Sequence, residues 1–203
     1  MKKYEFTEET IFVSGVTLKR IKAIKDFDNI KEGDLGGFIE KENNLSHKGK
    51  AWVYENACVF GNAQVIGNAQ VDMNAEISGN ALICDNAMVF DDAIVRGNAT
   101  VRDNAMVCYD AIVSDNATIY DNALVRDSAI VRDNAIVSDN AIIRDNALIC
   151  DRATICDNVK VCDDAIVCDN AIAYDNALIC NDAEVCGNAV VRNNSKICGY
   201  FKK

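Results

Sequence analysis

The sequence predicts an all-β chain: a left-handed parallel β-helix with three repeats, about 18 residues, in each triangular coil, preceded by a small N-terminal β-hairpin cap. Three observations lead to this fold class. Residues 49–198 divide into 25 consecutive six-residue repeats without an insertion. Most repeats read (Asp/Gly)-Asn-Ala-x-(Val/Ile)-x. Each repeat therefore turns one small and one branched aliphatic residue to the same side of a short strand, after a pair of turn-forming residues.

Each repeat is expected to form one strand and one corner, so three repeats close one triangular coil. At the corner, we expect the Asn before Ala to adopt the left-handed backbone conformation, which Asn tolerates better than most residues. The repeats supply about eight coils, which at a strand spacing of roughly 4.8 Å form a solenoid about 40 Å long.

Two regions are predicted. Residues 1–44 form an N-terminal hairpin and capping segment, and residues 45–203 form the β-helix. Residues 4–24 read as the hairpin, with its turn at Ser14 and Gly15. Residues 33–40 are turn-rich and lead into the first coil. A cap is expected there because an uncovered solenoid end exposes unpaired backbone groups.

The chain is acidic, with a formal net charge of −10. Residues 1–50 carry 10 basic and 9 acidic side chains, whereas residues 51–203 carry 11 basic and 22 acidic ones. The repeats thus hold the excess negative charge. Such a surface argues against direct nucleic-acid binding, which depends on Lys and Arg. It leaves open mimicry of nucleic acid toward a basic protein.

The sequence contains no apolar run of about 18 residues, so we expect no membrane segment. The first ten residues, MKKYEFTEET, lack the apolar stretch of a signal peptide. We therefore expect a cytoplasmic protein whose ten cysteines are free thiols. Two sets of three cysteines recur at intervals of 18, and we expect them to serve as small apolar corner residues rather than as a metal site: Cys150, Cys168 and Cys186, then Cys162, Cys180 and Cys198.

The repeats resemble the hexapeptide-repeat acyltransferases over about 150 residues. The N-terminal stretches KKYEFTEET, TLKRIKAIKDF and GDLGGFIEKENNLSHKGKAWV resemble the YdcK-like family of bacterial β-solenoid proteins. The resemblance implies a β-solenoid and an acyltransferase-like label. Under that label the cofactor would be acetyl-CoA.

Hexapeptide acyltransferases typically use a histidine base beside a loop that leaves the solenoid. This chain has one histidine, His47, which the repeat register places in a Val position of an incipient first coil. We expect it to be a partly buried, hydrogen-bonded capping residue. Its alternative role as a general base requires an acceptor pocket, and the uninterrupted repeats supply no loop to shape one.

Residues 18 apart should stack into columns along the solenoid. One outward column holds five consecutive aliphatic residues between Glu76 and Glu184, and we name it the aliphatic column: Ile94, Ile112, Ile130, Leu148 and Ile166. A continuous apolar stripe of this size predicts a protein–protein interface, most simply between copies of this chain. A second outward column places Met88, Met106 and Leu124 together as a second patch. The alternative is that β-propensity alone selects these residues.

The corners predict an acidic stack, named here the Asp column: Asp85, Asp103, Asp121, Asp139, Asp157 and Asp175. Asp115, Asp133, Asp151 and Asp169 form a second such stack. Carboxylates this close repel one another. We expect backbone N–H groups of each Asp's own turn to offset the repulsion, helped by Arg126 and Arg144. The alternatives are a cation such as Ca²⁺ and the mimicry surface named above.

These features favour a non-catalytic, oligomeric β-solenoid that binds a protein or a small ligand, with no cofactor and no metal. An acyl-CoA-dependent acyltransferase that uses His47 is the first alternative. An acidic nucleic-acid mimic is the second.

Overall fold

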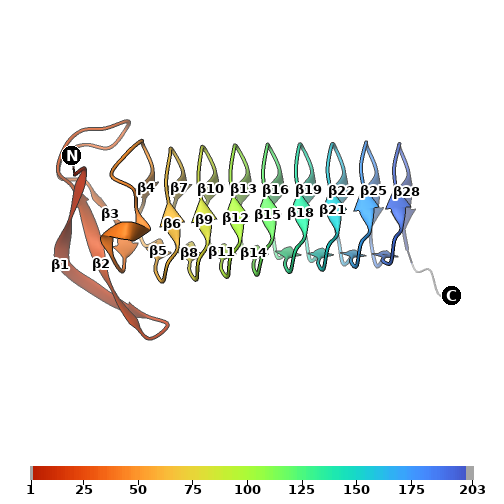
Figure 1. Ribbon diagram of the computed structural model, residues 1–203, viewed down its shortest axis with the longest axis horizontal. Helices are drawn as coiled ribbons and strands as arrows, with labels where there is room; N and C mark the ends of the chain where they lie inside the picture. The colour runs from red at the N-terminus through yellow and green to blue at the C-terminus, as the bar shows by residue number, and fades with distance from the viewer. Residues whose placement is uncertain (1, 200–203) are drawn as a thin grey trace.

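The computed structural model describes residues 2–199 and shows a parallel β-helix capped by an N-terminal hairpin (Figure 1). The predicted fold class is confirmed. The coils follow one another in a straight row, with the N-terminal hairpin at one end (Figure 1). Residues 2–199 contain no helix long and apolar enough to span a bilayer.

The strands form three sheets, one for each side of the triangle. Sheet 1 has eleven strands: β1 (Tyr4–Val13), β2 (Val16–Ala23), β3 (Leu35–Ile39), β5 (Cys58–Val59), β8 (Glu76–Ile77), β11 (Ile94–Val95), β14 (Ile112–Val113), β17 (Ile130–Val131), β20 (Leu148–Ile149), β23 (Ile166–Val167) and β26 (Glu184–Val185). Sheet 2 has nine: β4 (Trp52–Val53), β7 (Gln70–Val71), β10 (Met88–Val89), β13 (Met106–Val107), β16 (Leu124–Val125), β19 (Ile142–Ile143), β22 (Lys160–Val161), β25 (Leu178–Cys180) and β28 (Lys196–Cys198). Sheet 3 has eight: β6 (Gln64–Val65), β9 (Leu82–Ile83), β12 (Thr100–Val101), β15 (Thr118–Ile119), β18 (Ile136–Val137), β21 (Thr154–Ile155), β24 (Ile172–Ala173) and β27 (Val190–Val191).

The core is a stack of Ala and Val or Ile side chains inside the triangle. Ala123 and Val125 are both fully buried, while Leu124 between them is half-buried and faces outward. The coils pair in register at intervals of 18, as Leu124 does with Ile142. The small Ala lets the three walls approach closely, and each fully buried Val removes one branched side chain from water.

The corners differ from the prediction in one respect. The left-handed residue is the Asp or Gly before Asn, not the Asn itself: φ is 61° at Asp103 and 73° at Gly97. The Asn instead joins the coils. Its backbone N–H donates to the carbonyl of the left-handed residue one coil on, as Asn104 does to Asp121 at 2.8 Å. Asn side chains also bond along the stack, with Asn80 Nδ2 donating to Asn98 Oδ1 at 2.8 Å.

The hairpin is confirmed, with β1 and β2 antiparallel across the turn at Ser14 and Gly15. The turn-rich segment 33–40 proves to contain a strand, β3, which pairs with β2 on one side and with β5 of the first full coil on the other. Its glycines allow a close approach. A Cβ on Gly36 would lie 2.7 Å from the Trp52 ring, and one on Gly37 would lie 2.5 Å from the Ala57 carbonyl oxygen. A 3₁₀ turn, Glu42–Asn44, follows β3.

The first coil is out of step with the rest. Leu45 pairs with Val65, an interval of 20, whereas Trp52 pairs with Gln70 at the regular interval of 18. The corner between Leu45 and Ala51 is therefore two residues longer than the repeat. Leu45 fills the inward Val position that the sequence assigned to His47, and it is 1% exposed. The predicted core position of His47 is wrong because periodicity cannot register this insertion.

Candidate functional site

The aliphatic column lies on the outer face of sheet 1. Its neighbouring members pair in register, as Ile112 does with both Ile94 and Ile130, and Glu76 and Glu184 close its ends. All five side chains are half-buried. They stand side by side along one face, as the interval of 18 predicted.

The N-terminal end of the same face is covered by the protein itself. Phe38 and Cys58 precede Glu76 in this column, and they are 2% and 8% exposed. Leu18 of β2 is buried with them, and half-buried apolar residues of the hairpin pack against the cluster: Ile11, Val13 and Val16. The hairpin thus covers the start of this column, whereas the aliphatic residues beyond Glu76 have no such cover.

Sheet 2 carries the second patch. Met88, Met106 and Leu124 are stacked in register, and Ile142 extends the column. Met106, Leu124 and Ile142 form the floor of an open groove of about 540 Å³, whose lining also includes Phe90 and Tyr109. Neither aromatic residue was predicted from the sequence. Only Tyr109 carries a signal in the sequence, because it takes a corner position held by Asp in most coils, whereas Phe90 fills a variable position of the repeat.

Hydrogen bonds between coils offset the repulsion among the carboxylates of the Asp column. Asp139 accepts the backbone N–H of Asp157 at 3.3 Å, and Asp157 accepts that of Asp175 at 2.9 Å. The second stack behaves alike, with the backbone N–H of Asp169 donating to Asp151 at 3.2 Å. The predicted donors within the same turn are therefore wrong: each of these carboxylates binds the N–H one coil on, because the stacked corners point that group at it.

The predicted arginine partners also differ. Arg126 and Arg144 contact Asp127 and Asp145, which belong to a third corner stack. Arg102 pairs with Asp103 of the Asp column, and Arg132 pairs with Asp133 of the second stack. Side chains just before a corner reach the Asp that follows them in sequence, so each arginine serves its own corner.

One group in the third stack brings together atoms that could hold an ion. Oxygen or sulfur atoms of Asp145, Cys162 and Asp163 lie within 4.8 Å of one another. Asp145 Oδ2, however, already accepts from Arg144 at 2.7 Å and from the backbone N–H of Asp163 at 3.2 Å. The hydrogen bonds of the folded chain account for this carboxylate without a cation.

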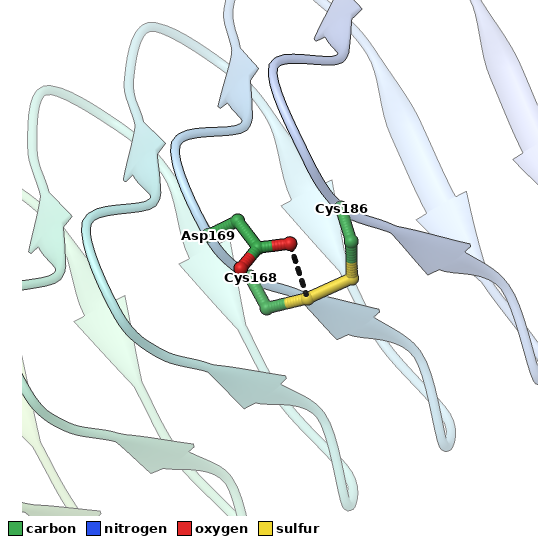
Figure 2. Close-up of side chains that lie close together, drawn as sticks. All are labelled: Cys168, Asp169 and Cys186. Carbon is green, nitrogen blue, oxygen red and sulfur yellow. Dashed lines mark hydrogen bonds between the residues drawn. A yellow bond between two sulfur atoms is a disulfide. The ribbon is translucent and has the colours of Figure 1, made fainter.

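Two disulfides join neighbouring coils at the C-terminal end: Cys168 with Cys186, and Cys180 with Cys198. Figure 2 shows the first, with Asp169 Oδ2 4.0 Å from Cys168 Sγ. The expectation of ten free thiols is wrong for these four cysteines, whose paired Cα atoms lie 4.7 Å apart. The same bond takes both sulfurs of the Cys168–Asp169–Cys186 group away from metal binding. The described residues include six free thiols.

His47 lies in the long first corner, in a depression of about 340 Å³ that it lines with Glu42 and Gln64. Its ring stacks on Tyr4 at 4.3 Å, and its Nδ1 accepts the backbone N–H of Lys3 at 3.3 Å. Burial lowers the pKa of His47, and the charge of Glu42 opposes that shift. His47 Nε2 is buried without a hydrogen bond, 4.0 Å from Glu42 Oε2. The predicted partly buried, hydrogen-bonded capping histidine fits this arrangement.

Lys3 is the most unusual group of the cap, because its side chain is 1% exposed. Its Nζ donates to the Ala51 carbonyl at 2.5 Å and lies 5.1 Å from the centre of the Phe27 ring. Burial lowers the pKa of Lys3 to about 8, with a further contribution from the charge of Lys25. The folded environment therefore favours the neutral form of the Lys3 amine more than water does.

A pH dependence of stability follows from Lys3. Between pH 8 and its ordinary pKa of 10.5, the unfolded chain binds more protons at this group than the folded chain, so stability rises with pH. Below pH 8 Lys3 is protonated in both states, and the folded chain bears the full cost of burying the charged amine. The free energy of unfolding of wild type relative to Lys3→Met should therefore increase by roughly 3 kcal/mol across this window. Urea unfolding of both proteins at a series of pH values measures it.

The comparison with Lys3→Met is needed because buried thiols act in the opposite direction. Burial raises the pKa of Cys58 and Cys108 to about 11, which makes stability fall as pH rises above about 9. Both proteins share that fall, so it cancels in the difference. A difference that stays flat from pH 8 to 10.5 would show that Lys3 is not held in a buried environment.

Parts of the chain are similar to known proteins of one family. A model of the YdcK β-solenoid repeat matches residues 81–97. A stretch of 63 residues, 27% of this chain, is 35% identical to the "Uncharacterized acetyltransferase YdcK" of Escherichia coli (strain K12). The predicted resemblance to the YdcK-like β-solenoid family is confirmed. The match covers 19% of that relative's own length, so any activity of a whole YdcK-like protein reaches this chain only as a proposal.

Proposed function

We propose that this YdcK-like solenoid is a non-catalytic binding or scaffold module that self-associates through the aliphatic column. The observation that carries the proposal is the sheet 1 face. Its first two positions, Phe38 and Cys58, are buried by the hairpin, while the next aliphatic positions, from Ile94 onward, are half-exposed. A second copy of the chain would complete for those positions the cover that the hairpin provides for the first two.

The size of the face suits such a contact. Seven of the strands in sheet 1 lie beyond the cover of the hairpin, from β8 to β26. At the usual spacings of strands and residues, this part of the face measures roughly 34 by 20 Å. Two such faces would bury about 1,400 Å² in total, which is within the range of an ordinary specific interface. Apolar residues along the centre with Glu76 and Glu184 at the ends follow the usual arrangement of an apolar core and a polar rim.

The test is the mass in solution of wild type beside Ile112→Arg/Ile130→Arg, measured by light scattering over a range of concentrations. Wild type should show a multiple of 22.2 kDa. The variant should show the single-chain mass, because two arginines in the centre of the interface would be desolvated without partners. Thr118→Arg/Ile136→Arg on sheet 3 is the matched control and should keep the wild-type mass. A wild type that stays at 22.2 kDa overturns the self-association.

Acyl transfer from acetyl-CoA is the second candidate, favoured by the name of the E. coli relative and by the depression beside His47. His47 would act as the base, with its pKa lowered by burial so that it is neutral near pH 7. The binding-module proposal needs no cofactor. Acetyl-CoA should therefore leave the melting temperature of wild type unchanged. Stabilisation by acetyl-CoA, together with an acyl transfer that His47→Ala abolishes, would favour the enzyme.

Nucleic-acid mimicry by the Asp column is the third candidate. The carboxylates accept backbone N–H groups along the column, as Asp157 does from Asp175, which offsets part of their charge. Competition with DNA for a basic protein, lost when the Asp column is replaced by Asn, would favour this candidate over the scaffold.

A further inference from the structure

The groove on sheet 2 has a composition unlike the rest of the solenoid surface. Its floor is formed by Met106, Leu124 and Ile142, and Phe90 and Tyr109 form one wall. Phe90 also borders a smaller depression of about 210 Å³, which Met73 and Met88 line. Three of the chain's four methionines, Met73, Met88 and Met106, therefore gather on this face. Methionine and aromatic side chains give an apolar surface that adapts to the shape of a ligand.

Two of these residues occupy positions that cost backbone free energy. Met73 and Tyr109 have φ of 56° and 58°, in the left-handed region where an ordinary side chain is disfavoured. The same corner is made by Asp91 and Asp127 in neighbouring coils, so the fold does not require a large residue there. Both side chains are nonetheless well exposed, at 42% and 50%. Backbone strain that is not offset by burial of the side chain is typical of a functional surface.

Three basic side chains also line the groove. Arg126 follows the middle strand β16, Arg144 follows β19, and Lys160 lies in β22 at the end of the groove. Lys160 is exposed and takes part in no ion pair within residues 2–199. Arg126 Nε is buried without a hydrogen bond, 3.7 Å from Asp127 Oδ2. Arg144 is paired with Asp145 at 2.7 Å. Lys160, at the end of the groove, is therefore the cation that favours an anionic group at one end of an apolar ligand, in a chain with a net charge of −10.

We infer that this groove binds an extended peptide segment of a partner protein, one with large apolar side chains and an acidic residue toward one end. From the coil of Phe90 to that of Lys160 there are four coil-to-coil steps, roughly 19 Å, which is the length of about six extended residues. The groove is open along its length, so a small molecule would remain largely in water, whereas a peptide spans it. The apolar side chains lie on Met106, Leu124 and Ile142, and the acidic residue meets Lys160.

The peptide binds through side chains and not as an added strand. Each strand on the groove floor is already paired on both sides: β13 lies between β10 and β16, and β16 lies between β13 and β19. Their backbone groups are therefore taken. This inference rests on the proposal that the chain is a binding module, but it does not depend on self-association through sheet 1.

The experiment selects octapeptides displayed on phage against the immobilised full chain and measures the labelled peptides by fluorescence anisotropy. The selected peptides should combine at least two large apolar residues with an acidic one. Tyr109→Asp and Lys160→Glu should each weaken their binding about tenfold or more, as loss of a central contact does. Thr118→Arg on sheet 3, outside both proposed surfaces, is the control and should leave the dissociation constant within about twofold.

Tyr109→Asp separates function from folding. Asp is the residue that the same corner uses in other coils, so the variant should melt at or above the wild-type temperature while it loses the peptide. Equal binding by wild type and Tyr109→Asp would overturn the inference, as would loss of binding in Thr118→Arg alone. Binding of the apolar anion 8-anilinonaphthalene-1-sulfonate to this groove, with no octapeptide selected, would overturn the peptide in favour of a small ligand. A monomeric wild type that still binds the octapeptides would overturn only the self-association.

Discussion

Ala117→Asp is expected to prevent the solenoid from folding, whereas Thr118→Asp, one residue further on, leaves it folded. Ala117 is fully buried inside the triangle, and Thr118 points outward from the neighbouring strand position. An aspartate at position 117 would have to bury a charge among Val and Ile side chains without a partner. That costs about 5 kcal/mol or more, which is comparable to the whole stability of many domains.

Far-ultraviolet circular dichroism and urea unfolding of the two variants measure this difference. The pair is matched in the introduced charge and in distance from the ends of the chain, so the direction of the side chain is the main difference. Two variants of equal stability would contradict the inward and outward alternation on which every column depends. Since exposed Thr118→Asp removes one β-branched residue from a strand, a loss of up to about 1 kcal/mol is expected there.

Loss of the two disulfides is expected to loosen the last coils while the rest of the solenoid remains folded. Each bond joins residues 18 apart, and closing a loop of this length stabilises a chain by about 3 kcal/mol in the entropic model. The effect should be local, because each coil of a solenoid contacts only its neighbours. Cys168→Ser/Cys180→Ser should therefore raise hydrogen exchange from about residue 166 to residue 198, with little change before it.

Cys84→Ser is the control, because Cys84 is a free thiol in an early coil, and it should leave exchange in the last coils unchanged. Alkylation followed by mass measurement checks the bonds themselves. The non-reduced chain should take up label at six cysteines and the reduced chain at ten. Ten labelled cysteines without a reducing agent would contradict the disulfides.

The repeat made the solenoid predictable to the level of single contacts. Once three repeats are taken as one coil, the partners of Ile112 on both sides follow, and the structure has them as predicted. The same interval predicted that the acidic corners stack. It could not predict which atoms offset the repulsion, because that depends on where the N–H of the next coil points.

The N-terminal region was less predictable because no periodicity governs it. The length of the first corner, and with it the place of His47, depends on how Leu45 meets Val65. The burial of Lys3 depends on contacts with residues distant in the sequence, such as Phe27 and Ala51. The groove on sheet 2 is partly predictable from the sequence, because Met73 and Tyr109 break the corner pattern.

We propose that sheet 1 is an interface between copies of this chain. A photo-crosslinking amino acid placed at Ile130 tests it most directly, with the same amino acid at Thr118 on sheet 3 as the matched position. Irradiation of the Ile130 protein should give a covalent dimer of twice the 22.2 kDa chain mass, linked to residues of sheet 1, and the Thr118 protein should give none. A dimer formed only by the Thr118 protein, or no dimer from either protein, would contradict an interface on sheet 1.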